Sequence, residues 1–271
     1  MYEIRLNTAR NALRLLIRAY NIKELFIPYY ICPVIREAII KENAKIKFYH
    51  IDNNFFPDTE AIKSFKKDSF ILYPNYFGIC AKNVYSLSND YKNLIIDNAH
   101  AFFMNQNLGL ASFVSLRKFF HTPDGSILYT KEKIDDNIIQ LLTRDEDRKT
   151  PTNENEFLLN ESLLNKLDIK LMSQKTSNFF NTLNLNHEKE KKLLKFNTLQ
   201  NRLSSHNDLE ISLTNNDIPY IYPYLTDSKK IKNKITNEIL KNFEVLRFWN
   251  SLPRNFLEYK FYKYLMVIKY D

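Results

Sequence analysis

A lysine and an aspartate follow two short apolar runs in the middle of the sequence. Asp97 ends the run LIID, and Lys118 comes shortly after the run at residues 112–114. Both runs, and a third at 126–129 that opens after Gly125, have the length and composition of buried strands. In an open sheet of parallel strands, side chains that follow the carboxyl ends of neighbouring strands meet where ligands bind. We therefore expect Asp97 and Lys118 to share one site.

A lysine amine beside a carboxylate suits chemistry in which the amine forms a Schiff base with an aldehyde. Leu116, Phe119 and Phe120 flank Lys118, and apolar surroundings favour the neutral amine. Pyridoxal 5'-phosphate (PLP) carries such an aldehyde, and a carboxylate such as Asp97 pairs with its ring nitrogen. The alternatives are a lysine that reaches solvent and an aspartate that caps a helix. Each residue alone favours its alternative, but together they indicate a PLP site.

The phosphate of such a cofactor needs hydroxyl or N–H donors. Ser112 and Ser115 precede Lys118 and are candidate hydroxyl donors. A helix that starts with Ala9 and Arg10 would offer its first backbone N–H groups, which bind anions at helix N-termini, and Arg10 would add charge. Ordinary turn serines and an exposed helical arginine are the alternatives.

Aromatic side chains near a predicted strand end are candidates for stacking on the cofactor ring. Tyr29 and Tyr30 follow a strand that ends at Pro28, and either ring has a face suited to stacking. Because the chain contains 17 tyrosines, a place in the core or at the surface is the safer interpretation for each one.

Two histidines lie close to the proposed pair. His100, three residues after Asp97, is a candidate for contact with the cofactor ring or its oxygen, and a buried structural histidine is an equal alternative. His121, near Lys118, is a candidate for assisting proton transfer. No His/Glu pair has the spacing of metal ligands, and the sequence has neither a phosphate-binding glycine-rich loop nor a G-x-S-x-G motif. We expect no metal site.

The composition indicates a folded protein. Its 271 residues are 44% hydrophobic and 14% aromatic, which is enough for a sizeable core. Charges at Glu3, Arg5 and Arg10 exclude a signal pattern at the start, and no run approaches the roughly 20 apolar residues of a membrane span. Cys32 and Cys80 are too few for a disulfide framework or a zinc cluster. These features together predict a cytoplasmic protein.

The net charge of +8 raises the question of nucleic-acid binding. The densest basic cluster is interleaved with acids and is predicted to be the solvated face of a helix; it comprises Lys189, Lys191, Lys192 and Lys195, with Glu188 and Glu190. Because no nucleic-acid fold signature accompanies it, we expect no DNA or RNA partner. A basic surface also suits an acidic small substrate such as a nucleotide diphosphate.

Alternating strands and helices predict an α/β fold, with a mostly parallel sheet covered by helices on both faces. The expected helices are 8–20 with Thr8 as N-cap, 32–41 and 59–65, and the expected strands are 25–27, 45–51, 70–73 and 94–96. Further on we expect a helix at 134–142, a polar connection at 144–156 and helical structure from 157 to about 203. A strand at 218–225, helices at 229–242 and 258–268 and a turn at 249–253 follow. This predicts a large domain over 1–142 and a helical connection with a smaller α+β domain over 143–271.

Several motifs resemble the DegT-like sugar aminotransferases, a family of fold-type I PLP-dependent enzymes with the aspartate aminotransferase-like fold. The segment TARNAL resembles the start of the family's first helix, and FIPYYICPVIREAI resembles its strand with a following proline and aromatic segment. IIDNAHAFF and SLRKFFHTPDGSILYT resemble the segments around its cofactor aspartate and lysine. IYPYL and the C-terminal tail from Phe248 resemble its small domain. The resemblance implies that Asp97 pairs with the pyridine nitrogen, that His100 replaces a common Gln, and that Lys118 holds the cofactor.

The resemblance further implies a PLP-dependent aminotransferase that aminates a keto sugar linked to a nucleotide, with glutamate as the common donor, for surface polysaccharide biosynthesis. Members of the family are homodimers with residues from both subunits at each site. The chain is short for the family, lacks most of its glycines and has Ala9–Arg10 in place of a Gly-Thr pair. Two alternatives therefore stay open. One is a PLP enzyme of another reaction type, such as a dehydratase, and the other is a non-catalytic homologue that serves as a binding or structural subunit.

Overall fold

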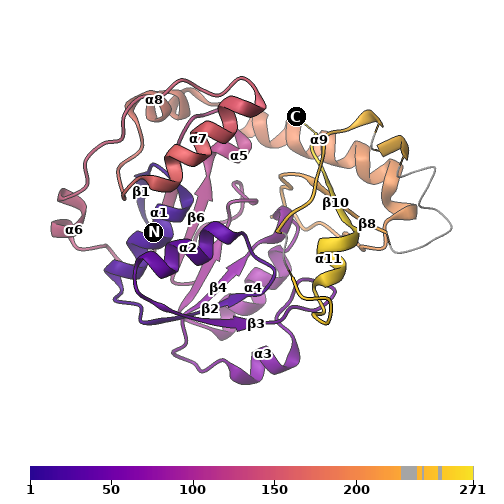
Figure 1. Cartoon of the computed structure of the whole chain (residues 1–271), viewed down its shortest axis with the longest axis horizontal. Coiled ribbons are helices and arrows are strands. Elements are labelled where there is room, and N and C mark those ends of the chain that lie inside the picture. The colour runs from indigo at the N-terminus through magenta and orange to yellow at the C-terminus, as the bar shows by residue number, and fades with distance from the viewer. Residues whose placement is uncertain (227–236, 240, 250–251, 271) are drawn as a thin grey trace.

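The computed structural model describes residues 1–226, 237–239, 241–249 and 252–270 (Figure 1). At its centre lies a seven-stranded sheet with the order β1-β7-β6-β5-β4-β2-β3. The strands are β1 (Tyr2–Leu6), β2 (Glu24–Pro28), β3 (Lys45–Tyr49), β4 (Ile71–Pro74), β5 (Leu94–Asp97), β6 (Ala111–Ser115) and β7 (Ser126–Thr130). The five strands β3, β2, β4, β5 and β6 run parallel, whereas β7 is antiparallel to both β6 and β1. The prediction of a mostly parallel sheet is confirmed.

Both faces of the sheet are buried, as its apolar strands predict. In β4 and β5, Leu72 and Ile95 belong to one core cluster, whereas Tyr73 and Ile96 belong to the cluster on the opposite face. Since successive side chains of a strand point to opposite faces, strands without polar positions must be covered on both sides.

Helices provide this cover on both faces. The core with Leu72 and Ile95 includes side chains of α1 (Ala9–Ala19) and α2 (Pro33–Lys41), and the opposite core includes side chains of α3 (Thr59–Ser64) and α4 (Ala81–Asp90). As predicted, Thr8 caps α1: its Oγ1 accepts the N–H of Asn11 at 3.2 Å. Pro33 occupies the first turn of α2, where its missing N–H costs nothing.

Short helical turns and the helices of the second half of the chain follow. A 3-10 turn, η1 (Tyr76–Gly78), follows β4, and α5 (Leu116–Phe119) follows β6 directly. The predicted helix at 134–142 forms only as α6 (Asp136–Gln140). The remaining helices are α7 (Glu154–Lys166), α8 (Gln174–Thr182) and α9 (Leu185–Leu203), and η2 (Ser204–His206) follows α9.

The prediction of uninterrupted helical structure from 157 to 203 is wrong between α7 and α8. There the chain runs along the edge strand β1: the Asn7 N–H donates to the Lys170 carbonyl, and the Met172 N–H donates to the Arg5 carbonyl, each at 3.0 Å. Met172 is fully buried. The backbone N–H and C=O groups that a helix would pair internally are paired here with the edge strand β1. No local sequence pattern predicts a hydrogen-bond partner so far away in the chain. Strand β1 itself was not predicted.

A second, three-stranded sheet has the order β8-β10-β9 and is antiparallel throughout. Its strands are β8 (Tyr222–Leu225), β9 (Val245–Leu246) and β10 (Leu265–Ile268). The predicted closing helix at 258–268 is wrong in its second half: α11 (Tyr259–Tyr264) ends where β10 begins. The run LMVI of β10 is buried on both faces, and pairing with two strands outweighs a helical spacing.

Figure 1 shows α9, β8, β10 and α11 gathered on one side of the large sheet. Phe261, Leu265 and Val267 share a core cluster with Tyr73 and Ile96 of the large sheet, so one apolar core joins the two sheets. Most of the predicted helix at 229–242 and part of the predicted turn at 249–253 lie outside the described residues. The boundary at residue 142 stays a prediction.

A buried ion pair fixes α1 against α2. Glu42, at the C-terminal end of α2, accepts from Arg14 at 2.7 Å and from Arg18 at 2.6 Å, and the side chains of Glu42 and Arg14 are each 6% exposed. This ion pair therefore helps to fix α1, whose N-terminus carries Ala9 and Arg10.

We expect Glu42→Ala to lower the free energy of unfolding by about 3 kcal/mol, because it leaves the buried Arg14 guanidinium without its main counter-charge. Glu60→Ala, which removes an exposed acid paired with Lys63, is the control and should change stability by less than about 1 kcal/mol. Urea denaturation followed by circular dichroism measures both. If both variants lower the free energy of unfolding by the same small amount, Arg14 is adequately paired by its other neighbours.

Candidate active site

Asp97 and Lys118 lie at the carboxyl ends of adjacent parallel strands. Asp97 is the last residue of β5 and pairs in register with Phe113 of β6, and Lys118 lies in α5, the helical turn that directly follows β6. The Asp97 carbonyl accepts the Asn75 N–H at 3.0 Å, and its carboxylate accepts the Ala99 N–H at 2.9 Å. No helix begins at Asp97, so its carboxylate does not act as the helix cap that was the alternative.

The two charged groups are close enough to influence each other. Burial raises the pKa of the Asp97 carboxyl, and the nearby Lys118 ammonium opposes that rise. Burial lowers the pKa of Lys118, and although Asp97 and Cys32 oppose the shift, Arg117 and Arg10 add to it. Desolvation therefore enriches the neutral amine, which is the nucleophilic form of lysine. Among the described residues no hydrogen bond or ion pair ties down the Lys118 amine.

The N-terminus of α1 reaches the same site. The Gly125 N–H, just before β7, donates to the Asn7 carbonyl at 2.7 Å and so fixes the entry to α1. Ala9 and Arg10 form the first turn of α1, where backbone N–H groups have no partner within the helix. The Arg10 guanidinium contributes to the lowered pKa of Lys118, so the structure brings the predicted phosphate contact and the predicted lysine together.

The two predicted serines differ in availability. The Ser112 hydroxyl is fully buried and donates to the Gln106 side-chain oxygen at 2.8 Å. Ser115 lies at the junction of β6 and α5, three residues before Lys118. Its position at the end of the strand makes Ser115 the better hydroxyl donor for a phosphate.

His100 is buried in a stack of aromatic rings. The ring centroids of Tyr220 and Trp249 lie 5.5 and 6.0 Å from that of the His100 imidazole, and the Trp249 ring is nearly parallel to it. Burial and, secondarily, the Lys118 charge hold the pKa of His100 well below its usual value. The imidazole is therefore neutral at pH 7 and lies close to Lys118.

The two predicted tyrosines have different surroundings. Tyr30 is fully buried in the core, 4.7 Å from the Trp249 ring centroid, and burial raises the pKa of its phenol strongly. The Tyr30 hydroxyl has no hydrogen-bond partner among the described residues. Tyr29 instead stacks on Phe48 at 4.8 Å, beside His50. Trp249 thus connects Tyr30 to His100, whereas His121 is exposed and forms none of these contacts.

The turn after Lys118 is anchored to α8 through a buried acid. The Asp124 carboxylate accepts from the Ser173 hydroxyl at 2.7 Å, from the Ser173 N–H at 2.8 Å and from the Thr176 hydroxyl. Gly125 follows with φ of +116°, and a Cβ there would lie 3.0 Å from a Thr176 methyl carbon. This position needs glycine both for its backbone angle and for the close approach of α8.

Sequence reasoning missed Arg117, Glu161 and Cys32. Arg117 precedes Lys118, and Glu161 of α7 forms ion pairs with both Arg117 and Arg10. Cys32, at the start of α2, opposes the lowering of the pKa of Lys118 and of Arg10. The SLRKFF segment contained a signal for Arg117, because a second cation beside a lysine suits an anionic ligand. No comparable local signal marks Glu161.

One part of the predicted solvated basic face is wrong. Lys192 is only 6% exposed, and its ammonium lies 6.0 Å from the Phe119 ring centroid and 5.9 Å from that of Tyr220. Aromatic faces attract a cation through their quadrupole, so rings from two other segments draw this lysine inward.

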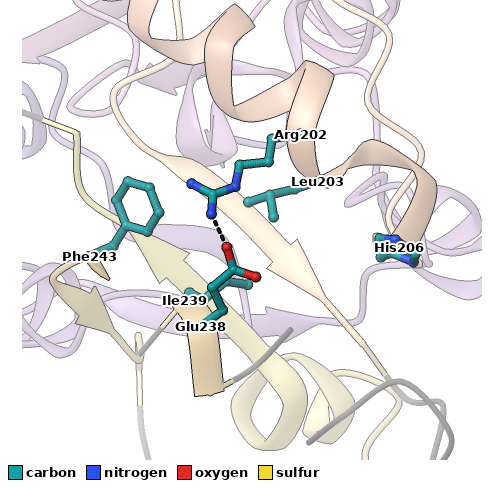
Figure 2. Close-up of a pocket in the computed structure, with 6 residues that line it drawn as sticks. All are labelled: Arg202, Leu203, His206, Glu238, Ile239 and Phe243. Atoms are coloured by element: carbon teal, nitrogen blue, oxygen red, sulfur yellow. Dashed lines mark hydrogen bonds and ion pairs between the residues drawn. The ribbon is translucent and has the colours of Figure 1, made fainter. Parts of the chain in front are cut away.

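One surface cavity lies away from Lys118. Its volume is about 140 Å³, and Figure 2 shows its lining of Arg202, Leu203, His206, Glu238, Ile239 and Phe243, with the ion pair between Arg202 and Glu238. None of these residues is a predicted site residue. Within the described ranges, no three His, Cys, Asp or Glu side chains are grouped to hold a metal ion, and no helix is long and apolar enough to cross a membrane. Cys32 and Cys80 are free thiols.

No family model and no curated protein matches the sequence, but many solved structures match the fold. A DegT/DnrJ/EryC1/StrS aminotransferase from Brucella abortus has a TM-score of 0.64 at 12% identity, over 99% of this chain and 80% of that one. PseC of Helicobacter pylori, an aminotransferase of pseudoaminic acid biosynthesis, has a TM-score of 0.62 at 17% identity, over 99% and 81%. The E. coli GDP-4-keto-6-deoxy-D-mannose-3-dehydratase with bound hydrated PLP has a TM-score of 0.66 at 15% identity, over 99% and 83%.

These similarities confirm the predicted fold class. The chain has the α/β fold of the fold-type I PLP-dependent enzymes, and the resemblance read from its motifs is confirmed at the level of the fold.

We expect the Lys118 amine to become reactive at lower pH than an exposed lysine such as Lys67, because a lowered pKa leaves more neutral amine at any pH below it. Asp97→Asn removes the charge that opposes this shift and should move the midpoint lower still. Trinitrobenzenesulfonate labelling across a pH series, quantified by peptide mass spectrometry, measures both. A midpoint for Lys118 at or above that of Lys67 would contradict this electrostatic account.

Proposed function

We propose that this protein is a PLP-dependent aminotransferase whose cofactor is bound by Lys118. The observation that carries the proposal is the pairing, at adjacent strand ends, of a partly desolvated lysine with a half-buried aspartate in a fold-type I framework. The residues present fit the cofactor. Asp97 would hold a proton on the pyridine nitrogen, the start of α1 with Ser115 would bind the phosphate, and His100 would lie against the ring.

PLP, when bound, supplies an electron-withdrawing ring that stabilises negative charge on the carbon next to an attached amine. The Lys118 Nζ, whose pKa is lowered by desolvation, would hold the cofactor and, once released, would move a proton. The Asp97 carboxylate would keep the ring nitrogen charged and so strengthen the effect of the ring. His100 and its aromatic neighbours exclude water from one side of the site.

The substrate we propose is a keto sugar linked to a nucleotide, aminated for surface polysaccharide biosynthesis with glutamate as donor. The structurally similar aminotransferases, one of which acts in pseudoaminic acid biosynthesis, support this choice, and the net charge of +8 suits a nucleotide diphosphate. A second PLP reaction, dehydration, is favoured by one specific observation, the similarity to a PLP-containing sugar dehydratase.

The absorption spectrum with added PLP tests cofactor attachment. We expect the native chain to develop a visible band that borohydride abolishes, and reduction to leave the cofactor on the peptide that contains Lys118. Lys118→Ala should lack the band, whereas Lys131→Ala, which changes an exposed lysine after β7, should retain it. If the native chain develops no band, the enzyme proposal fails and a non-catalytic binding subunit becomes the leading interpretation. Amine transfer from glutamate to keto-sugar nucleotides then separates transamination from dehydration.

We also propose that the protein is a homodimer and that the outer face of α7 contributes to its interface. Leu158, Leu159 and Leu163 lie on this helix and are 57%, 66% and 54% exposed. Neighbouring apolar side chains exposed on one helix mark interaction surfaces.

We expect Leu159→Glu with Leu163→Glu to convert the dimer to a monomer, because charges on a buried apolar interface cost several kcal/mol. Leu194→Glu, a change at an equally exposed leucine of α9, should leave the dimer intact. Sedimentation velocity measures the mass of each variant. A native chain that sediments as a monomer would refute the dimer, and a double variant that stays dimeric would exclude α7 from the interface.

A further inference from the structure

Two arginines beside Lys118 share a single carboxylate. The Arg10 guanidinium contacts Glu161 at 3.0 Å, and the Arg117 guanidinium contacts the other oxygen of the same carboxylate. The two arginine side chains are each 12% exposed, and that of Glu161 is 26% exposed. The two guanidinium groups therefore share one carboxylate at contact distance, while Glu37 attracts Arg10 and Asp124 attracts Arg117.

The positive charge at this point is under-compensated. Burial, with repulsion from Arg10, lowers the pKa of the Arg117 guanidinium to about 10, and burial lowers the pKa of Arg10. In addition, Arg10 Nη1 is buried without a hydrogen-bond partner among the described residues. A buried guanidinium N–H without an acceptor is unfavourable, and the missing acceptor is one that a phosphate, with its three terminal oxygens and charge near −2, can supply.

We propose that Arg10 and Arg117 form a seat for a phosphate monoester, and that the Glu161 carboxylate is an internal occupant of this seat which the phosphate displaces. The identification of that phosphate with the phosphate of PLP rests on the proposed function, whereas the seat itself does not. Glu161 then acts as a built-in competitor, which keeps the two arginines paired while the ligand is absent and weakens ligand binding.

Helix α7 is built to present Glu161 at this place. Phe157, one turn earlier on α7, lies 5.7 Å from the Arg117 guanidinium, and Asn160 donates to the Pro123 carbonyl at 2.7 Å. Leu164 is fully buried on the same face of the helix. The helix therefore stays anchored by its neighbours when the flexible Glu161 side chain leaves, and only that side chain has to move.

Two possible roles of Glu161, positioning the arginines and competing with the ligand, predict opposite effects of its removal on phosphate binding. If Glu161 only positioned the arginines for the ligand, its removal would weaken phosphate binding. If it competes with the ligand, removal strengthens binding. Glu161→Gln keeps the shape of the side chain and removes its charge, and Glu154→Gln is the matched control, since it removes an exposed charge from the first turn of the same helix.

The experiment measures three probes by titration calorimetry: inorganic phosphate, PLP and pyridoxal, which has the aldehyde but no phosphate. We expect Glu161→Gln to bind phosphate and PLP on the order of tenfold more tightly than the native chain, with pyridoxal affinity unchanged. We expect Arg117→Ala to weaken both phosphate-bearing probes by a similar factor, and Glu154→Gln to match the native chain. Circular dichroism melting curves confirm that each variant is folded.

Unchanged or weaker phosphate binding by folded Glu161→Gln overturns the proposal, and so does an equal gain for pyridoxal. These outcomes are distinct from failure of the enzyme proposal. A chain that binds inorganic phosphate more tightly as Glu161→Gln but never forms the borohydride-sensitive band has the seat without the chemistry. A native chain that forms the band, with affinities that do not respond to Glu161, has the chemistry without the competitor.

Discussion

The site depends on opposite charges held out of water at the carboxyl edge of a parallel sheet. Burial acts on Asp97 and Lys118 in opposite directions, raising the pKa of the acid and lowering that of the amine, and the attraction between them limits both shifts. Without Asp97, Lys118 would lose the main attraction that opposes the lowering of its pKa and would keep the repulsion of Arg10 and Arg117. The register between β5 and β6 sets the spacing of this pair, so the chemistry follows from the sheet.

The elements around the pair act as its supports. Glu42 locks α1 to α2 and so fixes the helix start that carries Arg10, while Asp124 ties the turn after Lys118 to α8. Both supports are buried carboxylates that accept several hydrogen bonds, which makes them directional and costly to break. The core cluster that includes Tyr30 and Phe261 joins the large and small sheets. Trp249 contacts both Tyr30 and His100, so this core also supports the aromatic stack around His100.

The sequence predicted the parallel strands, the first two helices and the Asp97–Lys118 pair because these depend on local patterns. Short apolar runs, the Thr8 cap and the proline of α2 carry their information within a few residues. What failed depends on distant partners. The stretch between α7 and α8 becomes extended because β1 offers hydrogen bonds, the LMVI run becomes β10 because β8 and β9 flank it, and Lys192 turns inward toward Phe119 and Tyr220. The same reason hid Glu161, since its two partners lie 151 and 44 residues away along the chain.

The charges of the site have a consequence for its order of assembly. Arg10, Arg117 and Lys118 are three cations near one another, and Asp97, Cys32 and Glu161 are among the groups that oppose them. An ammonium that loses its proton reduces this repulsion, and an arriving phosphate reduces it as well. Because the negative charge of the phosphate favours the charged form of Lys118, the two ways of relieving the repulsion oppose each other. Arg10 and Arg117, which lie near Lys118 in the fold, thus do more than attract an acidic ligand: they help to keep that lysine in its nucleophilic form before the ligand comes.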